Sequence, residues 1–144
     1  MKSKVILAAV FALGVVMPAA VDAAGSGPFG NWTMTDGTLT VRVSQCRGNL
    51  VCAEIARLPD PNNGDGTPKL DLKNKNPALR SRRLIGLPVM DGMIPTGPNT
   101  FKGKIYSSDD GNYYRAYATV TGDRLNVRGC WFVICKNLNF NRSK

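Results

Sequence analysis

The chain has 144 residues, with 19 Lys and Arg against 10 Asp and Glu, a formal charge of +9, four cysteines and no histidine. This length fits one domain of about 100–200 residues, and a hydrophobic fraction of 43% supports a core and excludes a disordered tail. The absence of histidine excludes Ser-His-Asp and Cys-His catalysis and histidine-ligated zinc.

The first 23 residues have the pattern of a secretory signal peptide. Two lysines precede an apolar run from Val5 to Val16, and Val21 and Ala23 place small or apolar side chains before a cut after Ala23. The run is shorter than the ~20 residues that span a bilayer, so a membrane anchor is the weaker interpretation. We expect residues 1–23 to be removed and residues 24–144 to form one periplasmic or secreted domain without a transmembrane segment.

Alternation of apolar and polar residues predicts about eight short strands. In chain order they are Phe29–Thr33, Thr38–Ser44, Leu50–Leu58, Arg83–Val89, Phe101–Tyr106, Asn112–Thr121, a strand marked by Leu125 and Val127, and Lys136–Arg142. Hairpin-type turns are expected at Asp36-Gly37, Asp110-Gly111 and Gly122-Asp123.

A long polar connection separates the third and fourth strands. Pro59–Lys69 is rich in Gly, Pro and Asn, and its acidic residues do not match the spacing of a calcium loop. Asn76 is expected to cap one or two helical turns that start at Pro77. Because no segment shows a long helical period, the fold class is all-β, either an antiparallel barrel or a sandwich with a short helical turn.

The four cysteines are expected to form two disulfides, because their number is even and the chain is exported. We favour the local pairings Cys46–Cys52 and Cys130–Cys135, since a turn at Gly48-Asn49 would set Cys46 opposite Cys52 across a hairpin. A four-thiolate zinc site is the alternative, but its usual spacing is not met. We expect no metal and no cofactor.

A series of short motifs runs through nearly all of the mature chain. The series comprises Gly30-Asn31-Trp32, Asp36-Gly37, Cys46, Leu50-Val51-Cys52, Asp71-Leu72-Lys73-Asn74, the block from Asn76 to Arg82, Ile85-Gly86-Leu87, Gly103-Lys104-Ile105-Tyr106, Gly111, Tyr114, the block from Leu125 to Cys130, Cys135, and Phe140-Asn141-Arg142. It resembles the domain of unknown function 2147 family of small exported bacterial proteins, with departures at Ala53, Arg83 and Phe140. The resemblance implies a calycin, a closed lipocalin-like barrel of eight strands, and no activity is established for the family as a whole.

A second likeness concerns the two ends of the mature chain. Lipocalin-like barrels carry a G-x-W motif on the first strand and an arginine near the last, which here are Gly30-x-Trp32 and Arg142. The arginine is expected to lie over the indole and to close one end of the barrel by a cation–π contact. This pair is a structural one.

Asp71, Asn74, Arg80 and Arg82 form a polar block with two possible roles. The block could clamp a carboxylate or phosphate at the barrel mouth, with the arginines as bidentate donors. Alternatively, Asp71 and Asn74 cap turns while Arg80 pairs with Asp71 and pins the long connection. We favour the structural role.

Three functional interpretations remain, and the leading one is a barrel that binds a small apolar or amphiphilic ligand. Its expected ligand-binding residues are Arg80, Arg82, Tyr106 and Tyr114. The alternative is a cationic protein with a filled barrel that binds an anionic envelope component, although the basic residues scatter and are densest only at Arg80, Arg82 and Arg83. An internal cavity of about 300 Å³ or more would favour the first, and a filled interior the second.

An enzyme is the least favoured interpretation. The carboxylates of Glu54, Asp71, Asp109 and Asp110 are not paired at a recognisable catalytic spacing. We therefore assign no catalytic residue. Nucleic acid is not an expected partner, because an exported protein rarely meets it.

Overall fold

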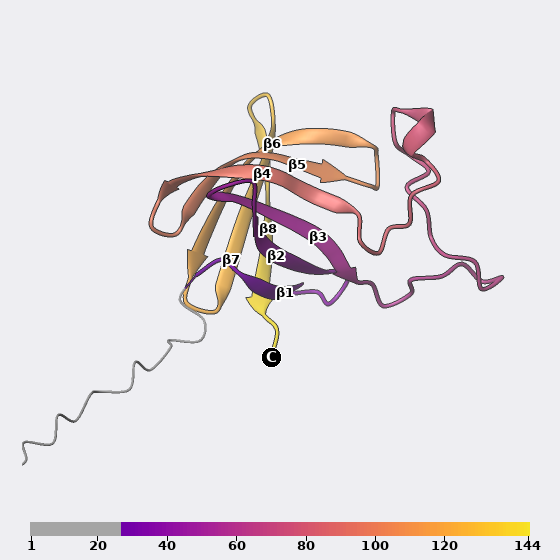
Figure 1. Ribbon diagram of the computed structural model, residues 1–144, viewed down its shortest axis with the longest axis horizontal. Coiled ribbons are helices and arrows are strands. Elements are labelled where there is room, and N and C mark those ends of the chain that lie inside the picture. The colour runs from indigo at the N-terminus through magenta and orange to yellow at the C-terminus, as the bar shows by residue number, and fades with distance from the viewer. Residues whose placement is uncertain (1–26) are drawn as a thin grey trace, which may run out of the picture.

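The computed structural model describes residues 27–144, so the expected signal peptide lies outside the described residues. Eight antiparallel strands form a closed barrel in which each strand pairs with its sequence neighbours and β8 returns to β1 (Figure 1). The strands are β1 (Gly30–Met34), β2 (Thr40–Cys46), β3 (Leu50–Arg57), β4 (Pro88–Gly97), β5 (Thr100–Ser107), β6 (Asn112–Thr121), β7 (Arg124–Trp131) and β8 (Ile134–Arg142). The predicted all-β barrel is confirmed.

The only helix among residues 27–144 is a single 3-10 turn, η1 (Pro77–Leu79). Asn76 caps it as expected, because its side chain accepts a hydrogen bond from the Ala78 backbone N–H. In the described part of the chain no helix has the length and apolar character needed to cross a bilayer.

Alternation along each strand builds the core. In β6, Ala116, Ala118 and Val120 are buried while the residues between them are exposed, as expected for a strand with one face inside a barrel. Buried side chains from all eight strands form the main core cluster, which includes Trp32, Met93 and Phe101, and Trp32 has 0% exposure. Ile55, Leu87 and Tyr106 form a second, smaller cluster.

The fourth strand lies further along the chain than predicted. The sequence pattern predicts Arg83–Val89, whereas β4 is Pro88–Gly97. The prediction is wrong because the register between β3 and β4 shifts at a β-bulge, which leaves Met90 and Met93 both buried although they are three residues apart. Gly92 has a φ of 81° in this bulge.

Both disulfides have the predicted local pairing. Cys46–Cys52 joins β2 to β3 with a Cα–Cα distance of 5.9 Å, and Cys130–Cys135 joins β7 to β8 with a distance of 4.1 Å. The cysteines of each pair stand at or near opposite positions of a hairpin ladder. Each bridge therefore ties together the ends of two adjacent strands.

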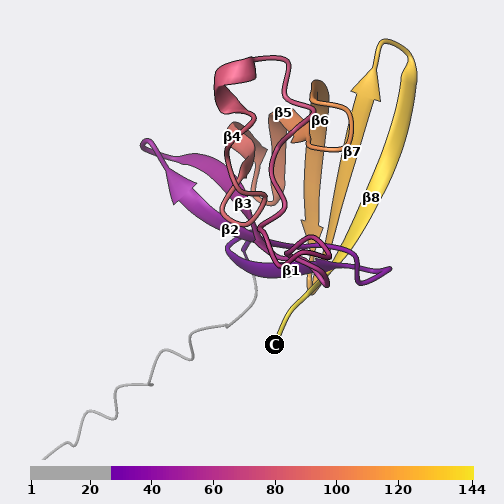
Figure 2. The same cartoon turned by 90° about the vertical axis from the view of Figure 1, so that its right-hand side faces the viewer.

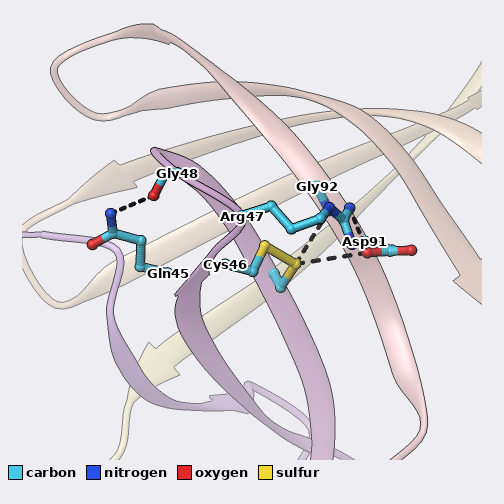
Figure 3. The surroundings of a disulfide bond; sticks show 7 residues. Gln45, Cys46, Arg47, Gly48, Asp91 and Gly92 are labelled. Atoms are coloured by element: carbon cyan, nitrogen blue, oxygen red, sulfur yellow. Dashed lines mark hydrogen bonds and ion pairs between the residues drawn. A yellow bond between two sulfur atoms is a disulfide. The ribbon is translucent and has the colours of Figure 1, made fainter.

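The first disulfide packs against the β4 bulge (Figure 3). The Gly92 N–H donates a hydrogen bond of 3.3 Å to Cys52 Sγ, and Arg47 forms an ion pair of 2.8 Å with Asp91. A Cβ atom on Gly92 would lie 2.6 Å from Nη2 of Arg47. Glycine is favoured here by its positive φ, and a side chain at this position would also displace the end of the flexible Arg47 side chain.

Trp32 and Arg142 meet at the seam where β1 pairs with β8. The Arg142 guanidinium carbon lies 4.2 Å from the Trp32 ring centroid, which is the cation–π contact expected from the sequence. The same guanidinium donates to the carbonyls of Gly27 and Phe29 at 2.7 and 2.9 Å and to Asp123 at 3.2 Å. One side chain thus ties the N-terminal segment and the β6–β7 turn to the seam.

Replacing Trp32 by Ala is expected to lower the free energy of unfolding by about 3–5 kcal/mol, because a large buried ring is lost from the core. Trp131→Ala is the matched control, since Trp131 is 52% exposed and its loss should cost less than about 1 kcal/mol. Equilibrium denaturation measures both values. A Trp32→Ala curve that overlays the parent curve would show that the seam does not depend on this ring.

Candidate functional site

A buried polar cluster holds the connection between β3 and β4, which lies across one end of the barrel (Figure 2). Asp71 in the connection has 0% exposure. Its carboxylate accepts hydrogen bonds from the Tyr106 hydroxyl at 2.7 Å and the Asn74 amide at 2.8 Å, and it forms an ion pair with Arg82 at 3.0 Å. The Asn74 amide also donates to the Tyr106 oxygen at 3.0 Å. A buried carboxylate is tolerated here because both of its oxygens have donors.

The arginine that pairs with Asp71 is Arg82, and the pairing with Arg80 considered from the sequence is wrong. After the η1 turn the chain runs back, and the Asp71 N–H donates to the Arg82 carbonyl at 2.9 Å. This backbone contact sets the Arg82 side chain beside the carboxylate. Nε of the exposed Arg80 donates instead to the Asn74 carbonyl at 2.8 Å.

The two tyrosines expected to bind ligand lie on opposite faces of the sheet. In the β5–β6 register Tyr106 pairs with Tyr113, while Tyr114 pairs with Ile105, and successive residues of a strand point to opposite faces. Burial, followed by the hydrogen bond to Asp71, raises the pKa of Tyr106 to about 12. The Tyr106 hydroxyl therefore stays protonated at neutral pH and serves the polar cluster.

Tyr114 has a separate set of contacts. Its hydroxyl donates to the Asp110 carboxylate, and this hydrogen bond lowers the pKa of Asp110 and raises that of Tyr114. The Tyr114 ring lies 5.9 Å from the Trp131 ring. The structure thus joins Tyr106 and Arg82 in one cluster, leaves Arg80 at its edge and places Tyr114 beside the β7–β8 hairpin.

Core side chains leave little empty space within the barrel. A cavity among them has a volume of about 10 Å³, which is no more than the space that a single water molecule needs. It is lined by Pro28, Val43, Val51, Met90, Met93, Phe101, Ala118 and Leu125. An acyl chain has no room at this position.

Strands β5–β8 carry charge of one sign only. Their sequences contain no Asp or Glu, and their cations are Lys102, Lys104, Arg115, Arg124, Arg128, Lys136 and Arg142. Five of these are exposed on the outer surface of the sheet, and we call them the cationic face: Lys102, Lys104, Arg115, Arg124 and Arg128. Lys104 stands directly opposite Arg115, an arrangement that like-charge repulsion disfavours.

The cationic face is not apparent in the sequence, because its members are spread over three strands. The signal that could have found it is the absence of Asp and Glu from each predicted strand after residue 100. An open groove of about 680 Å³ runs along the same surface, lined by outward side chains of β6, β7 and β8 that include Thr119, Arg124 and Asn139. Among residues 27–144 no three Cys, Asp or Glu side chains gather in a way that could hold a metal ion.

A closed barrel of eight antiparallel strands with this seam defines a lipocalin-like protein. The chain belongs to the family described as "Uncharacterized protein conserved in bacteria (DUF2147)", whose model matches residues 30–142. The chain is also similar to protein HP1028 from Helicobacter pylori, described as belonging to the lipocalin family, with 22% identity, a TM-score of 0.67 and coverage of 80% of this chain and 82% of that chain. At this identity the likeness shows a shared fold. No curated protein matches the chain.

Because of the polar cluster, we expect the free energy of unfolding to fall at alkaline pH. The folded-state pKa of Tyr106 is about 12 against an ordinary value of 10.0, so the folded protein keeps a proton that the unfolded chain releases. Stability is therefore expected to be lost as the pH rises from about 10 to about 12. Denaturation at a series of pH values measures this slope.

The variant Tyr106→Phe tests whether Tyr106 causes this dependence of stability on pH. It is expected to flatten the slope and to cost about 1–3 kcal/mol at neutral pH, because Asp71 loses a buried donor. Tyr117→Phe is the control, since Tyr117 is 45% exposed. An unchanged pH slope in Tyr106→Phe would contradict the assignment.

Proposed function

We propose that the protein acts outside the cytoplasm as a binding protein that attaches to anionic surfaces of the bacterial envelope through the cationic face. The observation that supports this most directly is the single sign of charge on four adjacent strands. Such a surface attracts polyanions over about 10 Å at ordinary salt concentration. Two disulfides support an exported location, because disulfides persist in oxidising compartments.

The arrangement of the cationic face suits an extended anion better than a point ligand. Lys102, Tyr117 and Arg128 lie side by side across β5, β6 and β7, and Lys104 and Arg115 form the next row. The outward groove continues the same surface toward Arg124. Rows of exposed cations can neutralise several anionic groups at once, and the proposal requires no catalytic residue.

A ligand inside the barrel is the second candidate, and the lipocalin-like fold favours it. Eight-stranded barrels hold either a packed core or one small ligand. Here the space among the core side chains is about 10 Å³, so a guest would enter only if residues such as Met90 and Met93 moved. We therefore place the binding surface outside the barrel.

Retention of the oxidised protein on dextran sulfate beads in a salt gradient tests the cationic face. The variant carries Lys104→Ser, Arg115→Ser and Arg128→Ser. At about 1 kcal/mol for each cation, we expect about 100-fold weaker binding.

The matched control carries Lys73→Ser, Lys75→Ser and Arg83→Ser, three exposed cations of the connection, and has the same net charge as the first variant. It should bind nearly as the parent does. Equal loss in the two variants would show that only net charge matters and would contradict the proposal.

A further inference from the structure

The β7–β8 hairpin ends in four consecutive apolar residues that face solvent, and we call residues 131–134 the apolar tip. Trp131, Phe132, Val133 and Ile134 are 52%, 80%, 95% and 75% exposed. The hairpin stands out beyond the neighbouring strands in both views of the barrel (Figures 1 and 2). A convex group of large apolar side chains is unfavourable in water unless something covers it.

The turn chemistry of the apolar tip is also unusual. Trp131 pairs with Ile134, so Phe132 and Val133 form a two-residue turn. Phe132 has a φ of 52°, a left-handed conformation that is costly for a bulky residue and that hairpin turns usually give to glycine. Local strain of this kind is often found at functional sites. The tip therefore exposes aromatic and aliphatic side chains although the positive φ of Phe132 makes the turn less stable.

Three features hold the apolar tip in one geometry. The Cys130–Cys135 disulfide bridges the strands immediately below it. The Trp131 ring lies 5.9 Å from Tyr114 and 5.4 Å from Phe132, both in edge contacts. Strand pairing continues to Trp131 and Ile134, so the backbone of the hairpin is held by the ladder up to the turn itself.

Basic side chains lie on the strands next to the base of the apolar tip. Arg115 pairs with Cys130 and Lys136 with Gly129, and Arg128 lies about 10 Å from Trp131 along the strand at about 3.3 Å per residue. The nearest turn also carries the carboxylates Asp109 and Asp110, of which Asp110 is hydrogen-bonded to Tyr114. Cations therefore outnumber carboxylates around the base of the tip.

We propose that the apolar tip inserts into the surface layer of an anionic phospholipid bilayer while the cationic face meets the headgroups. This inference rests on the proposed function and names its anionic surface as a lipid one. Trp favours the membrane–water interface, and an apolar insertion combined with a basic patch gives two signals for attachment where one alone is weak. A bilayer accommodates a convex finger, whereas a protein partner would need a matching groove, and the charge behind the finger fits anionic headgroups.

Vesicle flotation and tryptophan emission of the oxidised protein test the insertion. The chain has two tryptophans, and since Trp32 is fully buried, a shift of emission to shorter wavelength reports on Trp131. We expect this shift and co-flotation with phosphatidylglycerol vesicles, and much weaker binding to phosphatidylcholine vesicles. Unchanged emission and no flotation with either vesicle would overturn the inference.

The test variant carries Phe132→Gly and Val133→Ser, which suit a turn with positive φ at its first position. It should melt at or above the parent temperature, so loss of binding cannot come from unfolding. We expect about 10–100-fold weaker binding to phosphatidylglycerol vesicles with unchanged retention on dextran sulfate. The control Phe132→Leu with Val133→Ile keeps the tip apolar and should bind as the parent does.

The two proposals fail in different ways. If the Gly-Ser variant binds vesicles as the parent does, the apolar tip is not inserted, while the cationic face can still bind dextran sulfate. If the Lys104, Arg115 and Arg128 variant keeps its retention on dextran sulfate but the Gly-Ser variant loses the vesicles, the proposed function fails and insertion of the tip stands.

Discussion

The contact between the Arg142 guanidinium and the Trp32 indole lies where the first and last strands meet, and the closed barrel depends on that seam. Closure gives every strand a partner on each side, although β8 pairs with β1 only at Phe140, Asn141 and Arg142, and it reduces the open edges that a sheet would otherwise expose. It also encloses a space whose size is set by eight strands. Here Trp32, Met93 and Phe101 occupy that space. The filled interior leaves little room for a guest, which supports the proposal of a binding surface on the outside of the barrel.

The second constraint is the buried carboxylate of Asp71. A charge removed from water is stable only with donors around it, and Tyr106, Asn74 and Arg82 supply them. These contacts link the long connection to β5. Three of the residues that suggest a ligand clamp when read along the chain, Asp71, Asn74 and Arg82, therefore meet at the Asp71 carboxylate.

Two features of strands β5–β8 and their hairpin tip lower the stability of the fold. Lys104 faces Arg115 across the ladder, and Phe132 holds a left-handed turn with its ring in solvent. Interior packing, disulfides and turn residues elsewhere agree with the fold. Local conflicts of this sort are expected where a protein meets a partner, and here both lie on the same part of the barrel.

The likeness to lipocalin-like barrels implied the pair of Trp32 and Arg142. The sequence by itself determined the strands other than β4, the turns at Asp36-Gly37, Asp110-Gly111 and Gly122-Asp123, both disulfides and the Asn76 cap. These features follow from alternation, from short-range steric preference or from cysteines close together in the chain, so neighbouring residues carry the information. Only the tertiary structure decided the position of β4, the choice of Arg82 over Arg80, the filled interior and the cationic face. Each of these depends on the register between strands or on packing across the barrel, which brings together residues far apart in sequence and has no counterpart in a local pattern.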